Sequence, residues 1–339
     1  MRIESGMSRV LRPMVHRSGK THSTIEPNTA TLLLGFGPSG ALGILRSVGD
    51  SGALIISGRY PEHIRDRHSL PDADIIWLSD NPGIKYESLG PGDLEHRIVS
   101  RALKHLKGGG ALLLDDIEYI SVQRGFEAMA RFVKCLSDAA PHGKGRLLVV
   151  ADPAAFSKKQ LGCLVRFFDR VVTMDPEAKN KSRLSSLMLL SQAYLLDGTG
   201  EVSYRYVSSR VEDREMVCVT MVPPLRLRER HGFLCTEFIW LTEVGQGRDM
   251  FRPEKLCCDV QRALMRRLNS GSRPVVFLDA LDQLLIHVDF AQVLRFVKNI
   301  VDAAAVRGVT VIATADLDAL DTAQRAALSR RFDLSSKCV

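Results

Sequence analysis

The chain contains two copies of one sequence. The segments DIIWLS and EFIWLT place its two tryptophans, Trp77 and Trp240, 163 positions apart. Further along, the segment RFVK occurs at both 131–134 and 295–298, at an offset of 164. A repeat unit of about 150 residues has the size of a whole domain and far exceeds the period of a solenoid repeat. The sequence therefore predicts a duplicated globular domain.

The repeat sets the expected domain boundaries. We predict a basic, unstructured N-terminal tail at 1–29, a first domain at 30–176, a connecting segment at 177–192 and a second, more diverged domain at 193–335. The chain has 339 residues, of which 45% are hydrophobic and 25% charged. This composition supplies enough apolar side chains for two cores.

The composition predicts a soluble, cytoplasmic protein. No segment approaches the roughly 18 uncharged apolar residues that cross a bilayer, and the N-terminus lacks the apolar core of a secretory signal. The seven cysteines are odd in number and have no CxxC spacing, which favours reduced thiols over a disulfide framework or a zinc site. We therefore expect neither a membrane partner nor a structural metal.

The positive charge leaves nucleic acid open as a partner. The net charge is +7 and the pI is 9.1, values that suit an acidic partner. Part of the excess lies in the tail at 1–29, and elsewhere Arg and Lys alternate with acids without interleaved aromatic residues to stack bases. A solvated surface is the interpretation that we favour.

Short apolar runs alternate with amphipathic segments in each copy. In the first copy we expect strands at 31–35, 53–57, 75–78, 111–115, 147–151 and 170–174, and helices at 40–48, 61–67, 91–106, 125–140 and 157–168, with Asp93 as a helix cap. This alternation is typical of a parallel sheet covered by helices on both faces. Such sheets bind ligands beyond the carboxyl ends of their strands, where Gly35, Ser57, Asp115 and Asp152 are expected.

The loop after the first strand resembles a phosphate-binding loop that lacks the side chains needed to bind phosphate and magnesium. Gly35, Gly37 and Gly40 keep glycine spacing, but Ala41 and Leu42 stand where the motif requires lysine and a hydroxyl residue. Lysine neutralises the terminal phosphates and the hydroxyl holds magnesium, and neither alanine nor leucine can replace them. The sequence predicts no bound cofactor.

The fourth expected strand ends in a group of acids. The run at 112–114 followed by Asp115 resembles a Walker B strand, and Asp116 and Glu118 follow closely. These three carboxylates could hold a metal ion or could form hydrogen bonds at the turn, and we favour the second interpretation. Asp279 is the counterpart of Asp115 in the second copy.

The order of these motifs resembles the ATPase core of KaiC and RecA. In KaiC-like proteins a pair of glutamates follows the second strand and activates water, whereas this chain has Gly58 and Arg59 there, and Met221 and Val222 in the second copy. None of these residues can act as a general base. The resemblance implies two tandem three-layer, RecA/KaiC-like (Rossmann-like) α/β domains with mainly parallel sheets and without hydrolysis.

The chain also resembles the mainly archaeal family called domain of unknown function 835 (DUF835). The resemblance is carried by SGRYP at 57–61, IIWLS at 75–79, LLLDDIEY at 112–119, GFE at 125–127 and VADP at 150–153. It is close over about 50–170 and weaker in the second copy. Members of that family look like KaiC relatives without a phosphate loop and accompany sensor or kinase modules, which implies signalling by association.

The remaining candidate residues have structural and functional interpretations. Arg59 could bind an anion in the crevice or pair with Asp115, and we expect the pair. Asp152 is expected to begin the following turn. Trp77 and Trp240 are expected in the core or at a domain contact.

These observations predict a non-catalytic regulatory or scaffolding module that binds a protein partner or associates with itself. A fused pair of such domains could mimic two adjacent subunits of a ring. The first alternative is a nucleotide-binding protein or weak ATPase that uses the amides of 35–40 together with Asp115. The second alternative is a nucleic-acid-binding protein.

Overall fold

The computed structural model describes residues 27–47, 52–81, 86–174, 192–198, 200–211, 214–233, 235–244, 247, 249–269 and 274–337. The tail predicted at 1–29 and the connecting segment predicted at 177–192 therefore lie almost wholly outside the described residues. Within them, no helix is both long and apolar enough to cross a membrane.

The first repeat forms a parallel sheet of seven strands. Their spatial order is β4 (Ser88–Leu89), β3 (Asp74–Leu78), β2 (Leu54–Ser57), β5 (Ala111–Leu114), β6 (Arg146–Ala151), β1 (Thr29–Leu34) and β7 (Arg170–Thr173). Successive side chains of a strand point to opposite faces, so Leu112 and Leu114 enter one core and Leu113 the other. Apolar residues on both faces are what a sheet covered on both sides requires.

Helices cover both faces of this sheet. α1 (Pro38–Ser47) and α2 (Pro61–His68) pack on one face, and α3 (Val99–Lys107), α5 (Phe126–His142) and α6 (Lys158–Val165) pack on the other. α4 (Ile117–Arg124) follows β5, and the short turns are η1 (Pro91–Asp93), η2 (Leu94–Ile98, π-helical) and η3 (Pro153–Ala155). The result is a three-layer α/β domain.

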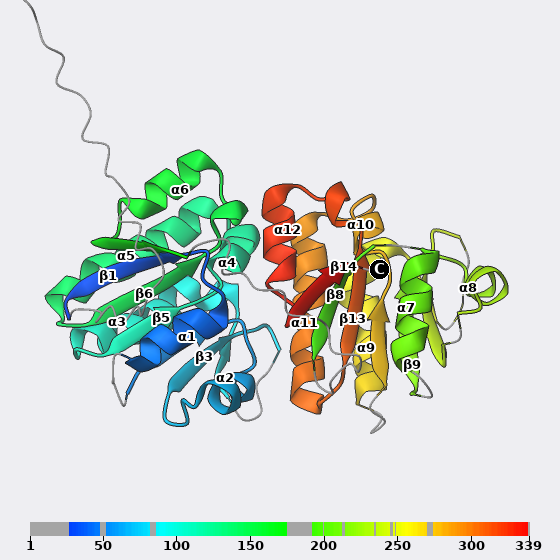
Figure 1. The fold of residues 1–339 in the computed structure, drawn as a ribbon, viewed down its shortest axis with the longest axis horizontal. Helices are drawn as coiled ribbons and strands as arrows, with labels where there is room; N and C mark the ends of the chain where they lie inside the picture. The colour runs from blue at the N-terminus through cyan, green and yellow to red at the C-terminus, as the bar shows by residue number, and fades with distance from the viewer. Residues whose placement is uncertain are drawn as a thin grey trace, which may run out of the picture.

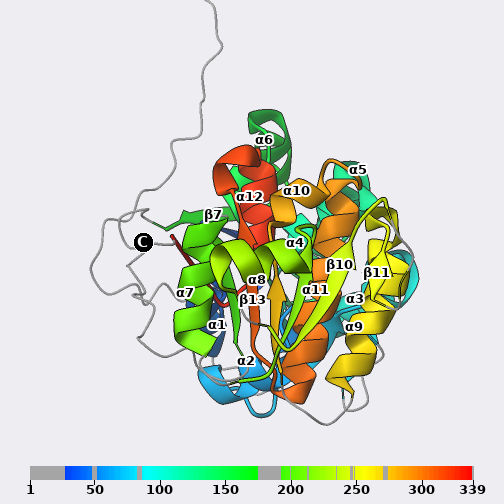
Figure 2. The ribbon, with the colours of Figure 1, turned by 90° about the vertical axis from the view of Figure 1, so that its right-hand side faces the viewer.

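The second repeat builds the same architecture. Its parallel sheet has the order β11 (Met250–Phe251), β10 (Glu237–Leu241), β9 (Met216–Thr220), β12 (Val275–Leu278), β13 (Val311–Ala315), β8 (Ala193–Asp197) and β14 (Leu334–Lys337). Figure 2 shows α7 (Glu201–Val211) on one face and α9 (Gln261–Leu268) and α11 (Phe290–Arg307) on the other. The remaining helical elements are α8 (Pro224–His231), α10 (Leu281–Leu284), α12 (Thr322–Ser329), η5 (Pro253–Lys255), η6 (Leu256–Val260) and η7 (Leu317–Ala319).

The alternation of strands and helices predicted from the sequence is confirmed, with three local corrections. The two-residue edge strand β4 was not predicted. α4 was not predicted, because its eight residues follow a buried strand without an N-capping side chain. Asp93 does not cap the predicted helix in the ordinary way. Its carboxylate accepts from the N–H of Gly90 (3.2 Å), three residues before it, while the helix itself begins with a π-helical turn.

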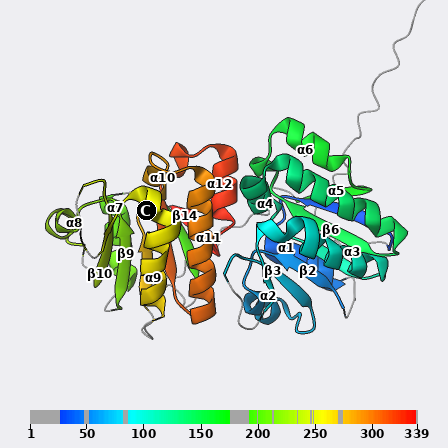
Figure 3. The same cartoon turned by 180° about the vertical axis from the view of Figure 1, so that it is seen from behind.

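The two domains meet through unlike surfaces. α11 and α12 of the second domain face the first domain (Figures 1 and 3), where α11 packs against α4 and α12 against η3. Both α4 and η3 follow strands of the first sheet, so they lie at its carboxyl edge. Tyr119 of α4 is 1% exposed and belongs to the core of the second domain. The edge at which parallel sheets bind ligands is therefore covered in the first domain.

Candidate functional site between the two domains

The glycine loop after β1 has lost the side chains that hold phosphate. Gly35 has a φ of +75°, a left-handed conformation that glycine adopts without strain. Gly37 is exposed beside it, and Gly40 lies in the first turn of α1. The same helix buries Ala41 and Leu42 in the apolar core. The two positions where a phosphate loop needs lysine and a hydroxyl residue are thus core positions here.

Two neighbouring strand ends place acids at the carboxyl edge. β2 ends at Ser57, whose hydroxyl donates to Asp115 Oδ2 (3.4 Å) and accepts from the N–H of Arg59 (3.1 Å). Asp116 then has a φ of +81°, which turns the chain from β5 into α4. That turn brings Glu118 to the same edge, and all three carboxylates are buried.

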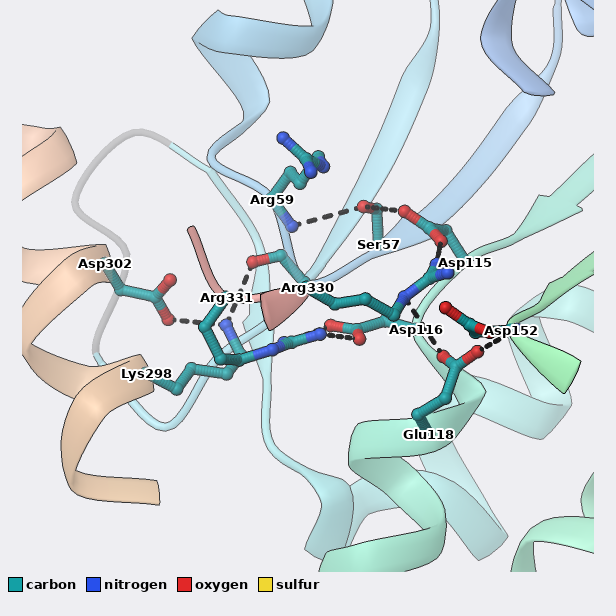
Figure 4. Close-up of polar contacts among 11 residues, drawn as sticks. Ser57, Arg59, Asp115, Asp116, Glu118, Asp152, Lys298, Asp302, Arg330 and Arg331 are labelled. Atoms are coloured by element: carbon teal, nitrogen blue, oxygen red, sulfur yellow. Dashed lines mark hydrogen bonds and ion pairs between the residues drawn. The ribbon is translucent and has the colours of Figure 1, made fainter. Parts of the chain in front are cut away.

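Two consecutive arginines of the second domain occupy these carboxylates. Arg330 forms an ion pair with Asp115, and its Nε lies 3.3 Å from Glu118 Oε2. Arg331 holds both oxygens of Asp116, and its guanidinium lies 5.3 Å from the ring centre of Tyr119. Figure 4 shows both side chains reaching across the interface. The acids of the first domain are therefore neutralised by residues about 215 positions away.

A buried lysine of α11 makes the second set of contacts. Lys298 Nζ donates to the carbonyl of Gly58 (2.9 Å) and to Asp302 Oδ2 (2.7 Å), and its side chain is 2% exposed. Asp302 also accepts from the hydroxyl of Ser79 (2.5 Å). Asn81 Nδ2 donates to the carbonyl of Asn299 (3.0 Å). The interface therefore satisfies its buried charges with paired partners, as burial requires.

Burial and pairing oppose each other in this network. Burial raises the pKa of Glu118, and Arg330 only partly lowers it. Burial likewise raises the pKa of Asp302 against the effect of Lys298. Burial by itself lowers the pKa of Arg330. The carboxylates of Glu118 and Asp115 together raise it by more, so the net pKa of Arg330 lies above the ordinary value. The cations thus offset part of the effect of burial on the pKa of Glu118 and Asp302.

The comparison with known families identifies both repeats. The model of the family described as "Protein of unknown function (DUF835)" matches residues 39–168 and 200–332, which together are most of the chain. The protein belongs to the DUF835 family. The resemblance found in the sequence is thereby confirmed for both copies, including the more diverged one. A search of the curated proteins found no match.

The second DUF835 domain satisfies its own strand-end acid. Asp279 accepts from Thr220 Oγ1 (2.8 Å), from the hydroxyl of Tyr204 (2.9 Å) and from Thr314 Oγ1 (3.3 Å). Burial raises the pKa of Asp279 against the effect of these hydrogen bonds. Tyr204 stands at the position of Ala41, where a phosphate loop carries its lysine. A side chain of the domain itself therefore fills this site.

The two DUF835 domains share the hydrogen bonds around their acids. Glu118 accepts from the N–H of Asp152 (2.5 Å), and Asp282 accepts from the N–H of Asp316 (3.0 Å). Asp152 in turn accepts from the N–H of Ala154 (2.9 Å) at the start of η3, so its predicted turn-capping role is correct. The predicted hydrogen-bonding role at the turn is thus found for Glu118 and its counterpart Asp282, whereas Asp115 and Asp116 form ion pairs with the arginines of the second domain.

The predicted partner of Arg59 is wrong. Its guanidinium forms an ion pair with Asp333 of the second domain (3.5 Å), and Arg330 is the cation paired with Asp115. Sequence reasoning missed Arg330 and Arg331 because an arginine pair after a helix resembles an ordinary basic helix end. One difference between the copies could have indicated the role of this pair: where the second copy has Arg330 and Arg331, the first copy has Arg166 and Phe167. Trp77 is 1% exposed in the core, as predicted.

The space left between the domains is small. The cavity lined by Arg59, Asp115, Lys298 and Arg331 has a volume of about 50 Å³. Ligand pockets for molecules of nucleotide size have volumes of roughly 300–1,000 Å³. Among the described residues, Glu243, Glu254 and His287 have ligand atoms within 4.8 Å of one another, but the two glutamates are exposed and lie in the second domain, away from this cavity.

Proposed function

We propose that this DUF835 protein is a non-catalytic interaction module, derived from a KaiC/RecA-type ATPase core, with a regulatory or scaffolding role in cytoplasmic signalling. It holds no nucleotide cofactor, and its partner is a protein. The ancestral catalytic edge of the first domain has become the surface on which another domain of the same type is bound.

One observation carries this proposal. Arg330 and Arg331 of the second domain neutralise Asp115, Asp116 and Glu118, the acids that would otherwise be available to a magnesium ion. Magnesium binds through carboxylates together with substrate phosphates. A metal ion could enter only if both arginines were displaced from the acids, and breaking a buried ion pair costs about 3–5 kcal/mol.

Two further features support the absence of hydrolysis. Ala41 and Leu42 are core residues, so the loop offers backbone amides without a lysine or a magnesium-binding hydroxyl. In the second domain, Tyr204 and Thr220 already donate to Asp279. Each domain thus lacks the charged groups with which phosphoryl transfer is catalysed.

Calorimetric titration of the full chain with ATP and magnesium tests the proposal. We expect neither binding heat nor phosphate release from the wild-type chain. Asp115→Ala and Asp279→Ala form a matched pair that assigns any binding to one domain. Micromolar binding that disappears in Asp115→Ala and persists in Asp279→Ala would overturn the proposal in favour of a nucleotide-binding protein.

A second titration with single-stranded and duplex nucleic acid tests the other class of partner. The positive net charge of +7 is the feature that favours nucleic acid. We expect no binding at physiological salt. Binding that falls steeply with added salt and is lost when residues 1–29 are removed would identify a nucleic-acid-binding protein instead.

A further inference from the structure

The interface within the chain uses α11 and α12 of the second domain and the carboxyl edge of the first. Among the described residues, no other domain covers the corresponding helix surface of the first domain or the carboxyl edge of the second. In the second domain, Lys298 and Asp302 of α11 are buried, with side chains 2% and 5% exposed. Their counterparts on α5 of the first domain, Lys134 and Asp138, are 54% and 62% exposed. The residues of the first domain that align with the contact residues of α11 and the segment after α12 form a surface that we call the donor face. It consists of Arg131, Lys134, Cys135, Asp138, Arg166 and Phe167.

The complementary surface is the carboxyl edge of the second domain. We call the receptor edge Thr242, Val244, Ala280, Asp282 and Ile286, which follow β10 and β12. Ala280 is buried at 4% exposure, and Thr242 and Asp282 are half-buried. Val244 and Ile286 are 78% and 80% exposed and are among the few large apolar side chains exposed in the described residues. In the first domain the equivalent edge is covered by α11 and α12.

The equivalence of these surfaces rests on matching hydrogen bonds as well as on sequence. Asp169 accepts from the N–H of Ala30 (2.8 Å), as Asp333 does from Ala193 (3.0 Å), which aligns the segments after α6 and α12. Near the other surface, the N–H of Val244 donates to Thr242 Oγ1 (3.1 Å). The N–H of Asn81 donates to Ser79 Oγ in the same way (3.2 Å).

Two polar pairs of the known interface have counterparts of the same chemistry. Arg330 with Glu118 corresponds to Arg166 with Asp282. Asp302 with Ser79 corresponds to Asp138 with Thr242, again a carboxylate and a hydroxyl group. The donor face therefore offers a cation where the receptor edge offers an acid. It also offers the carboxylate of Asp138 to the hydroxyl of Thr242, which in the single chain donates to the carbonyl of Val244 (3.0 Å) and has to rotate to form the new bond.

One other pair changes from polar to apolar on both surfaces. Arg331 with Asp116 corresponds to Phe167 with Ala280, where Phe167 is half-buried against the core of its own domain and presents only part of its ring.

A change on one surface alone would leave an unpaired polar group in a contact, which costs free energy. The paired change of Arg331 and Asp116 keeps the two surfaces complementary at that position. Asn81 donates to the backbone carbonyl of Asn299, and Val244 at the position of Asn81 has no such donor, so this bond is not kept. The pair of Arg59 with Asp333 is not kept, because Val222 replaces the arginine, so the second contact should be weaker than the first.

We propose that a second copy of this chain docks its donor face on the receptor edge, repeating between chains the contact that joins the two domains within one chain. The inference rests on the proposed interaction function and names its partner. Because the two surfaces differ, the association is heterologous and continues head to tail into a ring or a filament.

Light scattering after size-exclusion chromatography of the full chain tests this inference. The average mass should rise above that of one chain as the concentration increases. Arg166→Glu on the donor face and Val244→Asp on the receptor edge should each weaken association at least about tenfold. Lys104→Glu, an exposed charge reversal on α3, is the matched control and should associate like the wild type. Thermal unfolding of each variant verifies that it is folded.

Mixing the two interface variants separates this geometry from a symmetric dimer. Arg166→Glu retains a receptor edge and Val244→Asp retains a donor face, so an equal mixture should form a complex of two chains and nothing larger. A chain that stays monomeric at every concentration, or multimers that neither variant weakens, would overturn the inference. Calorimetry with ATP is a separate measurement, so the proposed function can fail while association persists, and the reverse also holds.

Discussion

The two domains bury the same strand-end carboxylate in opposite ways. Asp115 of the first domain is neutralised by Arg330 from the second domain, whereas Asp279 accepts three hydrogen bonds from Thr220, Tyr204 and Thr314 of its own domain. The first solution ties one domain to the other, and the second leaves its domain self-contained. One inherited acid has thus become a domain contact in one copy and a core hydrogen-bond acceptor in the other.

This difference explains why only the strand-end acid of the first domain is paired with a cation from the other domain. A buried carboxylate must be paired or hydrogen-bonded, because an isolated charge in the interior is strongly unfavourable. Tyr204 supplies a hydroxyl to Asp279, while Ala41 at the same position in the first domain supplies none. The first domain therefore depends on a cation from elsewhere.

The largest expected effect comes from breaking the second arginine pair. Arg331→Leu leaves Asp116 buried without a cation and should lower the free energy of unfolding by about 3–5 kcal/mol. Denaturant unfolding measures this change. The double variant Asp116→Ala with Arg331→Phe copies the pair found at 280 and 167 and should recover most of the loss. A double variant as unstable as the single one would show that the interface needs the charge itself.

The same substitution at the two strand-end acids should have different consequences. Asp115→Asn weakens the pair with Arg330 and should cost about 3 kcal/mol, because it leaves a buried guanidinium less compensated. Asp279→Asn keeps acceptors for Tyr204 and Thr220 without a buried charge, so at neutral pH it should be neutral or stabilising. Equal losses from both variants would contradict the distinction drawn between the two sites.

The pH dependence follows from the sign of the Asp279 shift. Its pKa is raised from the ordinary 3.8 in the folded state, so the folded protein binds this proton more readily than the unfolded chain. Its contribution to stability therefore decreases as pH rises from 3.8 through the folded pKa. Unfolding of wild type and Asp279→Asn across this range should show a smaller loss on raising pH in the variant. If the free energies of unfolding of the wild type and Asp279→Asn differed by the same amount at every pH, this account would be refuted.

Gly58 offers a smaller test of the same comparison. A Cβ at this position would overlap Asp116 Oδ2 and lie 3.1 Å from Arg331 Nη1, so the ion pair leaves no room for a side chain. Gly58→Ala should cost about 1–3 kcal/mol through overpacking. The second domain has Met221 here, opposite Ala280. In the Asp116→Ala, Arg331→Phe background the added methyl should therefore cost much less, and an undiminished cost would point to another cause.

The smallest effect is expected at the exposed lysine of the donor face. Lys134→Ala removes an ion pair with Asp138 that is more than half exposed, so stability of the dilute monomer should change by less than about 0.5 kcal/mol. Lys298→Ala, at the buried counterpart, is the contrasting variant and should be clearly destabilising. Thermal unfolding at low concentration measures both, and similar losses would remove the distinction between the covered and the uncovered surface.

Much of the fold was predictable because its signals are local. Strands such as Ala111–Leu114 are short apolar runs, and the flanking glycines and prolines limit where helices begin and end. The degenerate loop was equally visible, since Ala41 and Leu42 replace specific side chains at a known spacing. α4 was not predicted, because the αL conformation of Asp116 that directs it has no unambiguous sequence signal.

The sequence by itself determined that the chain is a duplicated α/β protein whose loops lack lysine and a magnesium-binding hydroxyl. Periodicity and residue identity suffice for those conclusions, because each depends on neighbours along the chain. Only the tertiary structure decided that Asp115 belongs to Arg330 and Arg59 to Asp333. Those pairs join residues more than 200 positions apart, and their formation depends on how two folded surfaces pack, which no local pattern records.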